Sequence, residues 1–299
     1  MTPTENQHID GTQLADGDTG ESSVPFVGFE SELNLALENK QLEIHLQPII
    51  SLGKWGLFGV ELLLRWKHPH HGLIMPEYII PGLEKAGLLH ETGQWVLDEA
   101  SRMNQLWQGN DQQPLYIFMN VSLSQFKHAQ FIDSLQTAIA NNSLLGEQLV
   151  LELSEDCFTE EPAVSQDKVK QLKESGIRLA LNYSGTALPL SSDFDNLPVN
   201  IIKLNKILIH QISHHQDKRA IMATISSFAH EHGLEVIAEG VETAEQLLFV
   251  NALCCTAAQG FLLGHPLDLA AFETHYHSGN NFEHVIEKCS LSLEKNKSL

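Results

Sequence analysis

The chain contains few cysteines and few basic residues, and both shortages exclude classes of protein. Its four cysteines among 299 residues fit no zinc-ligand spacing, so we expect reduced thiols and no disulfide framework. Lysine and arginine number 18 against 38 aspartates and glutamates, which gives a formal net charge of −20. Surfaces that bind nucleic acid or anionic membranes need basic residues, so we expect neither partner. A small phosphate ligand held by a few local cations is still compatible with this composition.

The sequence also lacks a long hydrophobic run near its amino end. Residues 1–28 are rich in Thr, Gly, Asp, Glu, Gln and Ser, which excludes a signal peptide or a membrane helix there. We predict a disordered acidic leader over residues 1–28, one domain over 29–277 and a polar tail over 278–299. Hydrophobic residues make up 42% of the chain, enough for the core of such a domain. These features predict a cytoplasmic protein.

Apolar runs alternate with helical patterns along the predicted domain. The runs predict eight strands, at 43–50, 57–66, 115–121, 148–153, 178–183, 200–204, 235–239 and 257–262. A helical pattern begins near residue 29, and further helices are expected at 91–108, 128–141, 164–175, 217–231 and 244–253. This alternation predicts an α/β fold, either a barrel or a doubly wound sheet, and periodicity alone does not separate the two.

The second predicted strand contains an acid and a base within an apolar run. Because strand side chains alternate, Glu61, Leu63 and Arg65 share one face. The residues between them, Leu62 and Leu64, point to the opposite face and predict a packing layer. Charged groups on a buried face need a partner or a ligand, so this strand predicts either a buried ion pair or part of a binding site.

Polar residues recur near the ends of the predicted strands. In a barrel, functional side chains gather at the carboxyl ends of the strands. Seven predicted strands carry a polar residue there: Glu61, Asn120, Glu152, Asn182, Lys203, Glu239 and Gln259. One such residue alone is more often a hydrogen-bonded core residue than a ligand. Seven in succession indicate a site.

The stretch Gly-Val-Glu-Leu-Leu-Leu-Arg-Trp at 59–66, with Leu-Gln-Pro-Ile at 46–49 before it, resembles the EAL domain family. Family members read Gly-Val-Glu-Ala-Leu-Leu-Arg-Trp there, and the change at Leu62 falls on the packing face. The resemblance covers roughly residues 29–276. It implies a modified (β/α)8 barrel of the TIM-like, EAL type, so it favours the barrel over the doubly wound sheet. Members bind cyclic di-GMP, and many hydrolyse it with two metal ions.

The resemblance also implies a role for each matching residue. It implies that Lys203 is the catalytic lysine and that Glu155 supports the loop after the fifth strand. Oxygen ligands suit Mg²⁺ or Mn²⁺, and the implied set is Glu61, Asn120, Glu152, Asn182 and Glu239. The implied nucleotide-binding residues are Gln47, Glu61, Leu63, Arg65, Asn120, Lys203, Glu239 and Gln259.

The fifth strand departs from the family pattern. Hydrolases of the family read Leu-Ala-Leu-Asp-Asp-Phe-Gly-Thr-Gly, whereas residues 179–187 read Leu-Ala-Leu-Asn-Tyr-Ser-Gly-Thr-Ala. The aspartate pair that serves both metals is replaced by Asn182 and Tyr183, which removes two negative charges from a site for two divalent cations. The following loop differs at Ala187 and Pro189. We therefore interpret the metal set and the catalytic role of Lys203 as vestigial.

Three functions remain open after these comparisons of residues. The retained nucleotide-binding positions favour a catalytically inactive regulator that binds cyclic di-GMP and acts through a protein partner. The altered loop favours a nucleotide-independent interaction module. An active metal-dependent phosphodiesterase is the third alternative. We expect the first, with no required cofactor; Mg²⁺ or Mn²⁺ would matter only for residual phosphodiesterase activity. A homodimer is compatible with this interpretation.

Overall fold

The structure is a computed structural model that describes residues 30–107, 115–141, 146–160, 162–184, 199–212, 216–276 and 285. The predicted leader, the predicted tail apart from Val285, and the loop positions Ala187 and Pro189 lie outside these residues. Within the described ranges, no helix is long and apolar enough to cross a membrane. The described cysteines are free thiols; Cys157 and Cys255 are buried and Cys254 is exposed.

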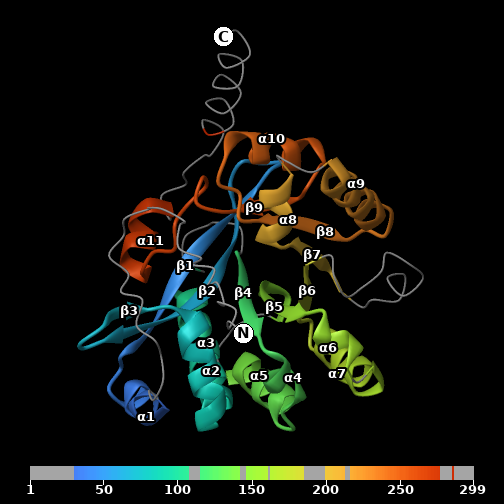
Figure 1. The fold of residues 1–299 in the computed structure, drawn as a ribbon. Coiled ribbons are helices and arrows are strands. Elements are labelled where there is room, and N and C mark those ends of the chain that lie inside the picture. Colours follow the sequence, from blue (N-terminus) through green and yellow to red (C-terminus); the bar gives the residue numbers. More distant parts are fainter. Residues whose placement is uncertain are drawn as a thin grey trace, which may run out of the picture.

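The strands form one sheet that closes on itself. They are β1 (Leu42–Ser51), β2 (Leu57–His68), β3 (Gly72–Ile74), β4 (Tyr116–Val121), β5 (Leu149–Ser154), β6 (Arg178–Tyr183), β7 (Ile201–Leu204), β8 (Glu235–Glu239) and β9 (Ala257–Gln259). The sheet order is β1-β9-β8-β7-β6-β5-β4-β2-β3, and an additional pairing of β1 with β2 closes a ring of eight strands. β1 is antiparallel to both neighbours, whereas β2 and β4 to β9 are parallel. The predicted α/β barrel is confirmed, with β3 as a hairpin extension outside the ring (Figure 1).

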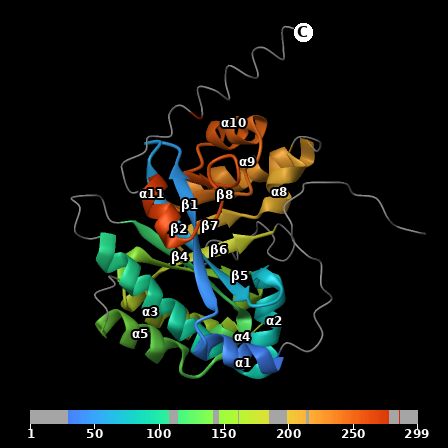
Figure 2. The ribbon, with the colours of Figure 1, turned by 90° about the vertical axis from the view of Figure 1, so that its left-hand side faces the viewer.

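The helices lie outside the strands, as Figure 1 and Figure 2 show from two directions. They are α1 (Glu30–Glu38), α2 (Pro76–Ala86), α3 (Leu89–Trp107), α4 (Leu123–Lys127), α5 (Phe131–Asn141), α6 (Asp156–Thr159), α7 (Pro162–Glu174), α8 (Lys206–Gln211), α9 (Gln216–Glu231), α10 (Ala244–Ala252) and α11 (Leu269–Tyr276), with a 3-10 turn at Gly146–Gln148.

The sequence pattern predicted the long helices and missed the short ones. α4, α6, α8 and α11 have eight residues or fewer, too few to show a helical period. α2 is longer, but it contains Pro76 and Pro81, which usually indicate a helix end. Pro76 stands in the first turn of α2, where no backbone N–H is needed. The last predicted strand ends at Gln259 and not at residue 262.

An apolar plug fills the inside of the barrel near the amino ends of the parallel strands. Its buried members are Ile49, Phe118, Val150, Ala180, Ile201, Ile237 and Ala257, and Phe58 and Tyr116 pack against them. The opposite faces of the same strands are buried against the helices in a larger cluster. The barrel is therefore a two-sided core and not a pore, as expected for eight strands.

A ring of polar side chains lies directly on this plug. Because side chains alternate, the residue two positions beyond each plug residue faces the same interior. In β4 to β9 these residues are Asn120, Glu152, Asn182, Lys203, Glu239 and Gln259. β1 runs in the opposite direction, so Gln47 precedes Ile49 by two positions. β2 contributes Glu61, two positions after Gly59. The alternation thus collects the predicted polar residues at one end of the barrel.

Gly59 permits the close approach of β2 to β4 beneath this ring. A Cβ atom at Gly59 would lie 2.5 Å from the carbonyl oxygen of Tyr116 and 3.0 Å from the ring of Phe118. We predict that Gly59→Ala lowers the free energy of unfolding by about 1–3 kcal/mol, measured by urea denaturation, because the added methyl group overpacks the core. Gly53→Ala is the control, since a Cβ there meets nothing within 4 Å. Equal stability of the two variants would contradict this packing.

Candidate functional site

Lys203 of β7 lies at the centre of the polar ring. Its side chain is completely buried. The Nζ atom lies 3.0 Å from Oε2 of Glu61 and 2.5 Å from Oε1 of Glu152, and both carboxyl groups are buried as well. A cation removed from water requires such partners, because its desolvation is otherwise uncompensated. Glu61, Glu152 and Lys203 therefore form one buried ion triad.

Two side-chain amides donate hydrogen bonds to the carboxylate of Glu61. The Nδ2 group of Asn120 donates a hydrogen bond to Oε1 of Glu61, with 2.6 Å between the two atoms. Gln259 donates its Nε2 to Oε2 of Glu61 at 2.8 Å and to Oε1 of Gln47 at 2.9 Å. Gln47 in turn donates to the carbonyl of Gly264 at 3.1 Å. The predicted residues from β1, β2, β4, β7 and β9 thus belong to a single hydrogen-bonded network.

Arg65 is not the partner of Glu61, although the sequence left that ion pair open. Its Nη1 donates to the carbonyl of Leu64 at 2.9 Å, and the residue is only 4% exposed. It lies opposite Glu43 in the β1–β2 register. Arg65 shares a strand face with Glu61 and lies four residues nearer the carboxyl end of β2. Its guanidinium therefore lies on the mouth side of the triad.

The triad shifts the pKa values of its members in different directions. Burial acts against the charge of Lys203, but the carboxylates of Glu152 and Glu61 outweigh it and raise the pKa of Lys203. Burial also acts to raise the pKa of Glu61, but attraction by Lys203 and hydrogen bonds from Lys203, Gln259 and Asn120 bring it below its ordinary value. Burial and the charge of Glu61 raise the pKa of Glu152 to about 8. Burial likewise raises the pKa of Glu239. Glu61 is therefore the acid of the ring that ionises most readily.

β6 brings Asn182 to the ring and turns Tyr183 away from it. Asn182 lies beside Lys203 in the β6–β7 register. Its Oδ1 atom is buried and has no hydrogen-bond partner within the described part of the chain. Tyr183 points to the outer face, where it is 3% exposed and packs in the large apolar cluster. Burial and the charge of Glu155 raise the pKa of its phenol. Of these two residues, only Asn182 faces the site.

Glu155 connects the ends of β5 and β6. Its Oε1 accepts hydrogen bonds from the backbone N–H of Ser184 at 2.7 Å and from the hydroxyl of Ser184 at 2.8 Å. Ser184 directly follows β6, at the point where the predicted loop begins. The role predicted for Glu155, support of that loop, concerns a segment whose residues after Ser184 are not described.

The described ring offers fewer charged oxygen atoms to a centre of two divalent cations than the family pattern does, because Asn182 stands where the hydrolases have an aspartate. Among the residues that the structure describes, no group of three or more His, Cys, Asp or Glu side chains is arranged to hold a metal ion. The space between Glu61 and Glu152 is spanned by the ammonium group of Lys203. β6 adds one neutral oxygen, the unpartnered Oδ1 of Asn182, and no carboxylate. Hard divalent cations prefer charged oxygen ligands, and the ring contributes Glu61, Glu152 and Glu239 as acids.

The family model of the EAL domain matches residues 30–266, most of the chain. The chain belongs to the EAL-domain family. It is 37% identical over 236 residues to MucR of Pseudomonas aeruginosa, a bifunctional diguanylate cyclase/cyclic di-GMP phosphodiesterase. This match covers 79% of the chain and 34% of MucR. It is 32% identical over 244 residues to NbdA, a cyclic di-GMP phosphodiesterase of the same organism, with 82% and 31% covered. The chain spans about a third of the length of these relatives.

Solved EAL structures share the barrel. The PaMucR phosphodiesterase in its c-di-GMP complex matches with a TM-score of 0.77 and 36% sequence identity, over 81% of this chain and 98% of that chain. The EAL domain of FimX from Xanthomonas citri, in complex with c-diGMP, matches with a TM-score of 0.71 over 80% and 93% of the two chains. At 20% identity the second match concerns the fold alone. The EAL-type barrel expected from the sequence is therefore confirmed.

Sequence reasoning located the ring of this EAL barrel but not its internal contacts. It identified the polar residues by strand position and missed that Lys203 pairs with both Glu61 and Glu152. That pairing joins residues 142 and 51 positions apart, and no local pattern encodes it. It also grouped Tyr183 with Asn182 at the metal centre. Strict strand alternation was the signal that separates these two neighbours.

Removal of the central cation should destabilise the domain. We predict that Lys203→Met lowers the free energy of unfolding by about 3–5 kcal/mol, because it leaves Glu61 and Glu152 as buried, unpaired acids. Urea denaturation at neutral pH measures the loss. Lys170→Met is the control, since that lysine is exposed and its ammonium group lies 4.0 Å from the carboxylate of Glu174. Adding Glu152→Gln to Lys203→Met should recover part of the stability. A Lys203→Met protein as stable as wild type would disprove the triad.

Proposed function

We propose that the chain is an EAL-type receptor that binds cyclic di-GMP at the mouth of the barrel and does not hydrolyse it. One observation carries this proposal: β6 places the neutral amide oxygen of Asn182 in the ring, where the hydrolases of the family have an aspartate. Hydrolysis with two metals requires both the nucleophile and the leaving oxygen to be clamped by cations. The ligand itself is suggested by MucR and NbdA, whose names include cyclic di-GMP phosphodiesterase.

Recognition in this proposal rests on the arginine and the amides of the ring. Lys203 is bound to Glu61 and Glu152, and the phosphate or a guanine edge is assigned to Arg65. Its planar fork matches such bidentate acceptors. Gln47, Asn120 and Gln259 supply neutral amides that exchange hydrogen bonds with the bases. Leu63 and Glu239 complete the proposed contact set. No cofactor is required for this mode of binding.

The proposed receptor transmits its signal through a protein partner. The output of the receptor is proposed to be a contact with a second protein. The partner is proposed to be a protein and not nucleic acid or membrane, because the net charge is −20. A homodimer is compatible with this function and is not required by it.

A metal-dependent cyclic di-GMP phosphodiesterase is the second candidate function. It is favoured by the identity of 37% to MucR and by the presence of Glu61, Asn120, Glu152, Lys203 and Glu239 in the ring. In this alternative, Mg²⁺ or Mn²⁺ would bind with Asn182 as a neutral ligand.

Calorimetric titration with cyclic di-GMP, with and without Mn²⁺, tests the proposal when the same samples are analysed chromatographically for linear dinucleotide. We expect binding under both conditions and no cleavage above background. Metal-dependent cleavage that Glu61→Ala abolishes would establish the second candidate instead. Absence of binding under both conditions would favour a nucleotide-independent interaction module.

Arg65 provides the mutational test of the binding pose. We predict that Arg65→Ala weakens cyclic di-GMP binding by about 1.5–3 kcal/mol, the range for a charged hydrogen bond. Isothermal titration without divalent metal measures the change. Arg102→Ala is the matched control, because that arginine lies on the outer helix α3 and pairs with Glu99. Equal affinities of Arg65→Ala and wild type would refute the pose.

Asn182 and Tyr183 are expected to respond differently to substitution by aspartate. Asn182→Asp adds a carboxylate at the ring, so we predict that Mn²⁺ binds roughly tenfold more tightly or better, as ligand charge increases. Tyr183→Asp instead places an acid in the outer apolar cluster, and we predict a loss of about 2–4 kcal/mol in unfolding free energy. Calorimetry with Mn²⁺ and urea denaturation measure the two effects.

The control for the added charge is Asn200→Asp. Asn200 lies outside the ring, and its Oδ1 atom accepts a hydrogen bond from the backbone N–H of Leu179. This substitution should leave Mn²⁺ affinity unchanged. If Asn182→Asp behaves like this control, Asn182 does not face the cation site. If Tyr183→Asp is as stable as wild type, Tyr183 is not part of the apolar cluster.

A further inference from the structure

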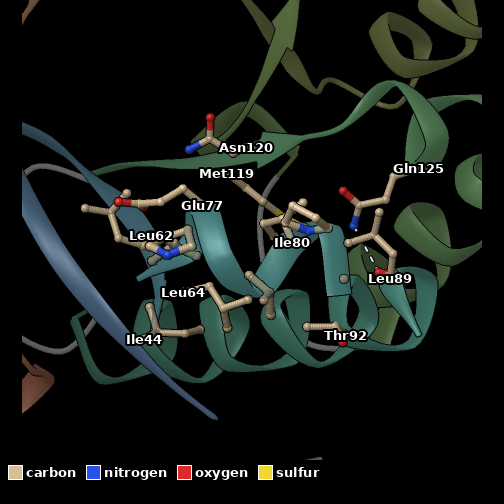
Figure 3. A pocket seen from close by; sticks show the side chains of 15 residues that line it. Ile44, Leu62, Leu64, Glu77, Ile80, Leu89, Thr92, Met119, Asn120 and Gln125 are labelled. Atoms are coloured by element: carbon tan, nitrogen blue, oxygen red, sulfur yellow. Dashed lines mark hydrogen bonds between the residues drawn. The ribbon is translucent and has the colours of Figure 1, made fainter. Parts of the chain in front are cut away.

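A cavity lies beside the polar ring, between β2 and helices α2 and α3. Its volume is about 510 Å³, within the range of small-molecule sites. Figure 3 shows Asn120 at its upper edge and Thr92 at its lower edge, with Leu64 and Ile80 between them. Leu62 and Leu64 form its floor, on the strand face opposite Glu61. Leu63 and Asn120, which belong to the proposed nucleotide contact set, also line the cavity, whereas Glu61, Glu152 and Lys203 do not.

The lining selects against anions. It contains no lysine, arginine or histidine, and its one charged side chain is the acidic Glu77. Most of the wall is aliphatic, including Ile44, Ile80 and Val96. An anion placed here would lose its hydration and meet no cation, which costs several kcal/mol. Carboxylates and phosphates are therefore excluded, and an uncharged apolar molecule is favoured.

Thr92 supplies the polar anchor of this cavity. The residue is 3% exposed, and its Oγ1 atom has no hydrogen-bond partner within the described residues. Its backbone N–H is satisfied by the carbonyl of Leu88 at 2.9 Å, so only the hydroxyl is left unpaired. A buried hydroxyl without a partner is unfavourable, and a ligand oxygen would relieve it.

We propose that this cavity is a binding site for an uncharged amphiphile, namely an aliphatic molecule with one hydroxyl or carbonyl oxygen. The chain of the ligand packs against Leu64, Ile80 and Val96, and its oxygen pairs with the hydroxyl of Thr92. Met119 and Asn120 of β4 line the cavity, and Asn120 also belongs to the polar ring. The occupied cavity therefore adjoins the polar ring without using any residue of the triad.

Octanol and octanoate are the probes that test this site, because they share an aliphatic chain and differ in charge. Titrations followed by methyl NMR chemical shifts use the full chain without nucleotide, so their outcome is independent of cyclic di-GMP binding. We expect octanol to bind and octanoate to bind at least tenfold more weakly. Val96→Phe, which fills the cavity, should abolish octanol binding.

Variants of Thr92 test the anchor. Thr92→Val should weaken octanol binding roughly two- to tenfold, the effect of one hydrogen bond, and should raise the melting temperature of the free protein. Thr92→Ser keeps the hydroxyl and should retain affinity. Thr224→Val on α9 is the control, since that hydroxyl bonds to the carbonyl of Ala220. Absence of octanol binding, equal binding of octanoate, or octanol binding unchanged in Val96→Phe would overturn the proposal.

Discussion

The site depends on one buried cation. Lys203 is held between Glu61 and Glu152 in a space closed to solvent, where burial acts to raise the pKa of both acids and the ammonium group acts to lower it. Each partner comes from a different strand, so the triad also ties β2, β5 and β7 together across the barrel. A barrel interior that contains polar groups must satisfy them internally, and here the lysine does so without an added ion.

The ring stands where it does because of the layer beneath it. Plug residues such as Phe118 and Ile201 fill the amino half of the barrel, and strand alternation places Asn120 and Lys203 one step above them. Because the plug occupies the amino half of the barrel, the polar groups lie at the carboxyl ends of the strands, which are the functional end of such barrels. At β6 the same alternation places two neighbouring residues on opposite faces of the strand. Asn182 faces the ring, whereas Tyr183 is buried in the outer apolar cluster.

The sequence predicted the barrel and the members of the ring, because both follow from local apolar runs and from a motif around Glu61. It did not predict the partner of Glu61, since Arg65 is near in sequence whereas Lys203 is near only in the closed barrel. It missed α2 because Pro76 and Pro81 indicate a break, although the structure accommodates both. The cavity under α2 was equally hidden, since it depends on how that helix packs against β2. Local patterns thus specified the elements and not the long-range contacts.

Native mass spectrometry of the chain with cyclic di-GMP and a series of Mn²⁺ concentrations tests the central claim most directly, because it counts metals and nucleotide in one complex. If the neutral Asn182 leaves a two-metal centre incomplete, the bound dinucleotide remains intact and the complex contains at most one specifically bound Mn²⁺. A complex with two tightly bound Mn²⁺ ions per chain, or with a dinucleotide heavier by one water molecule, would contradict it.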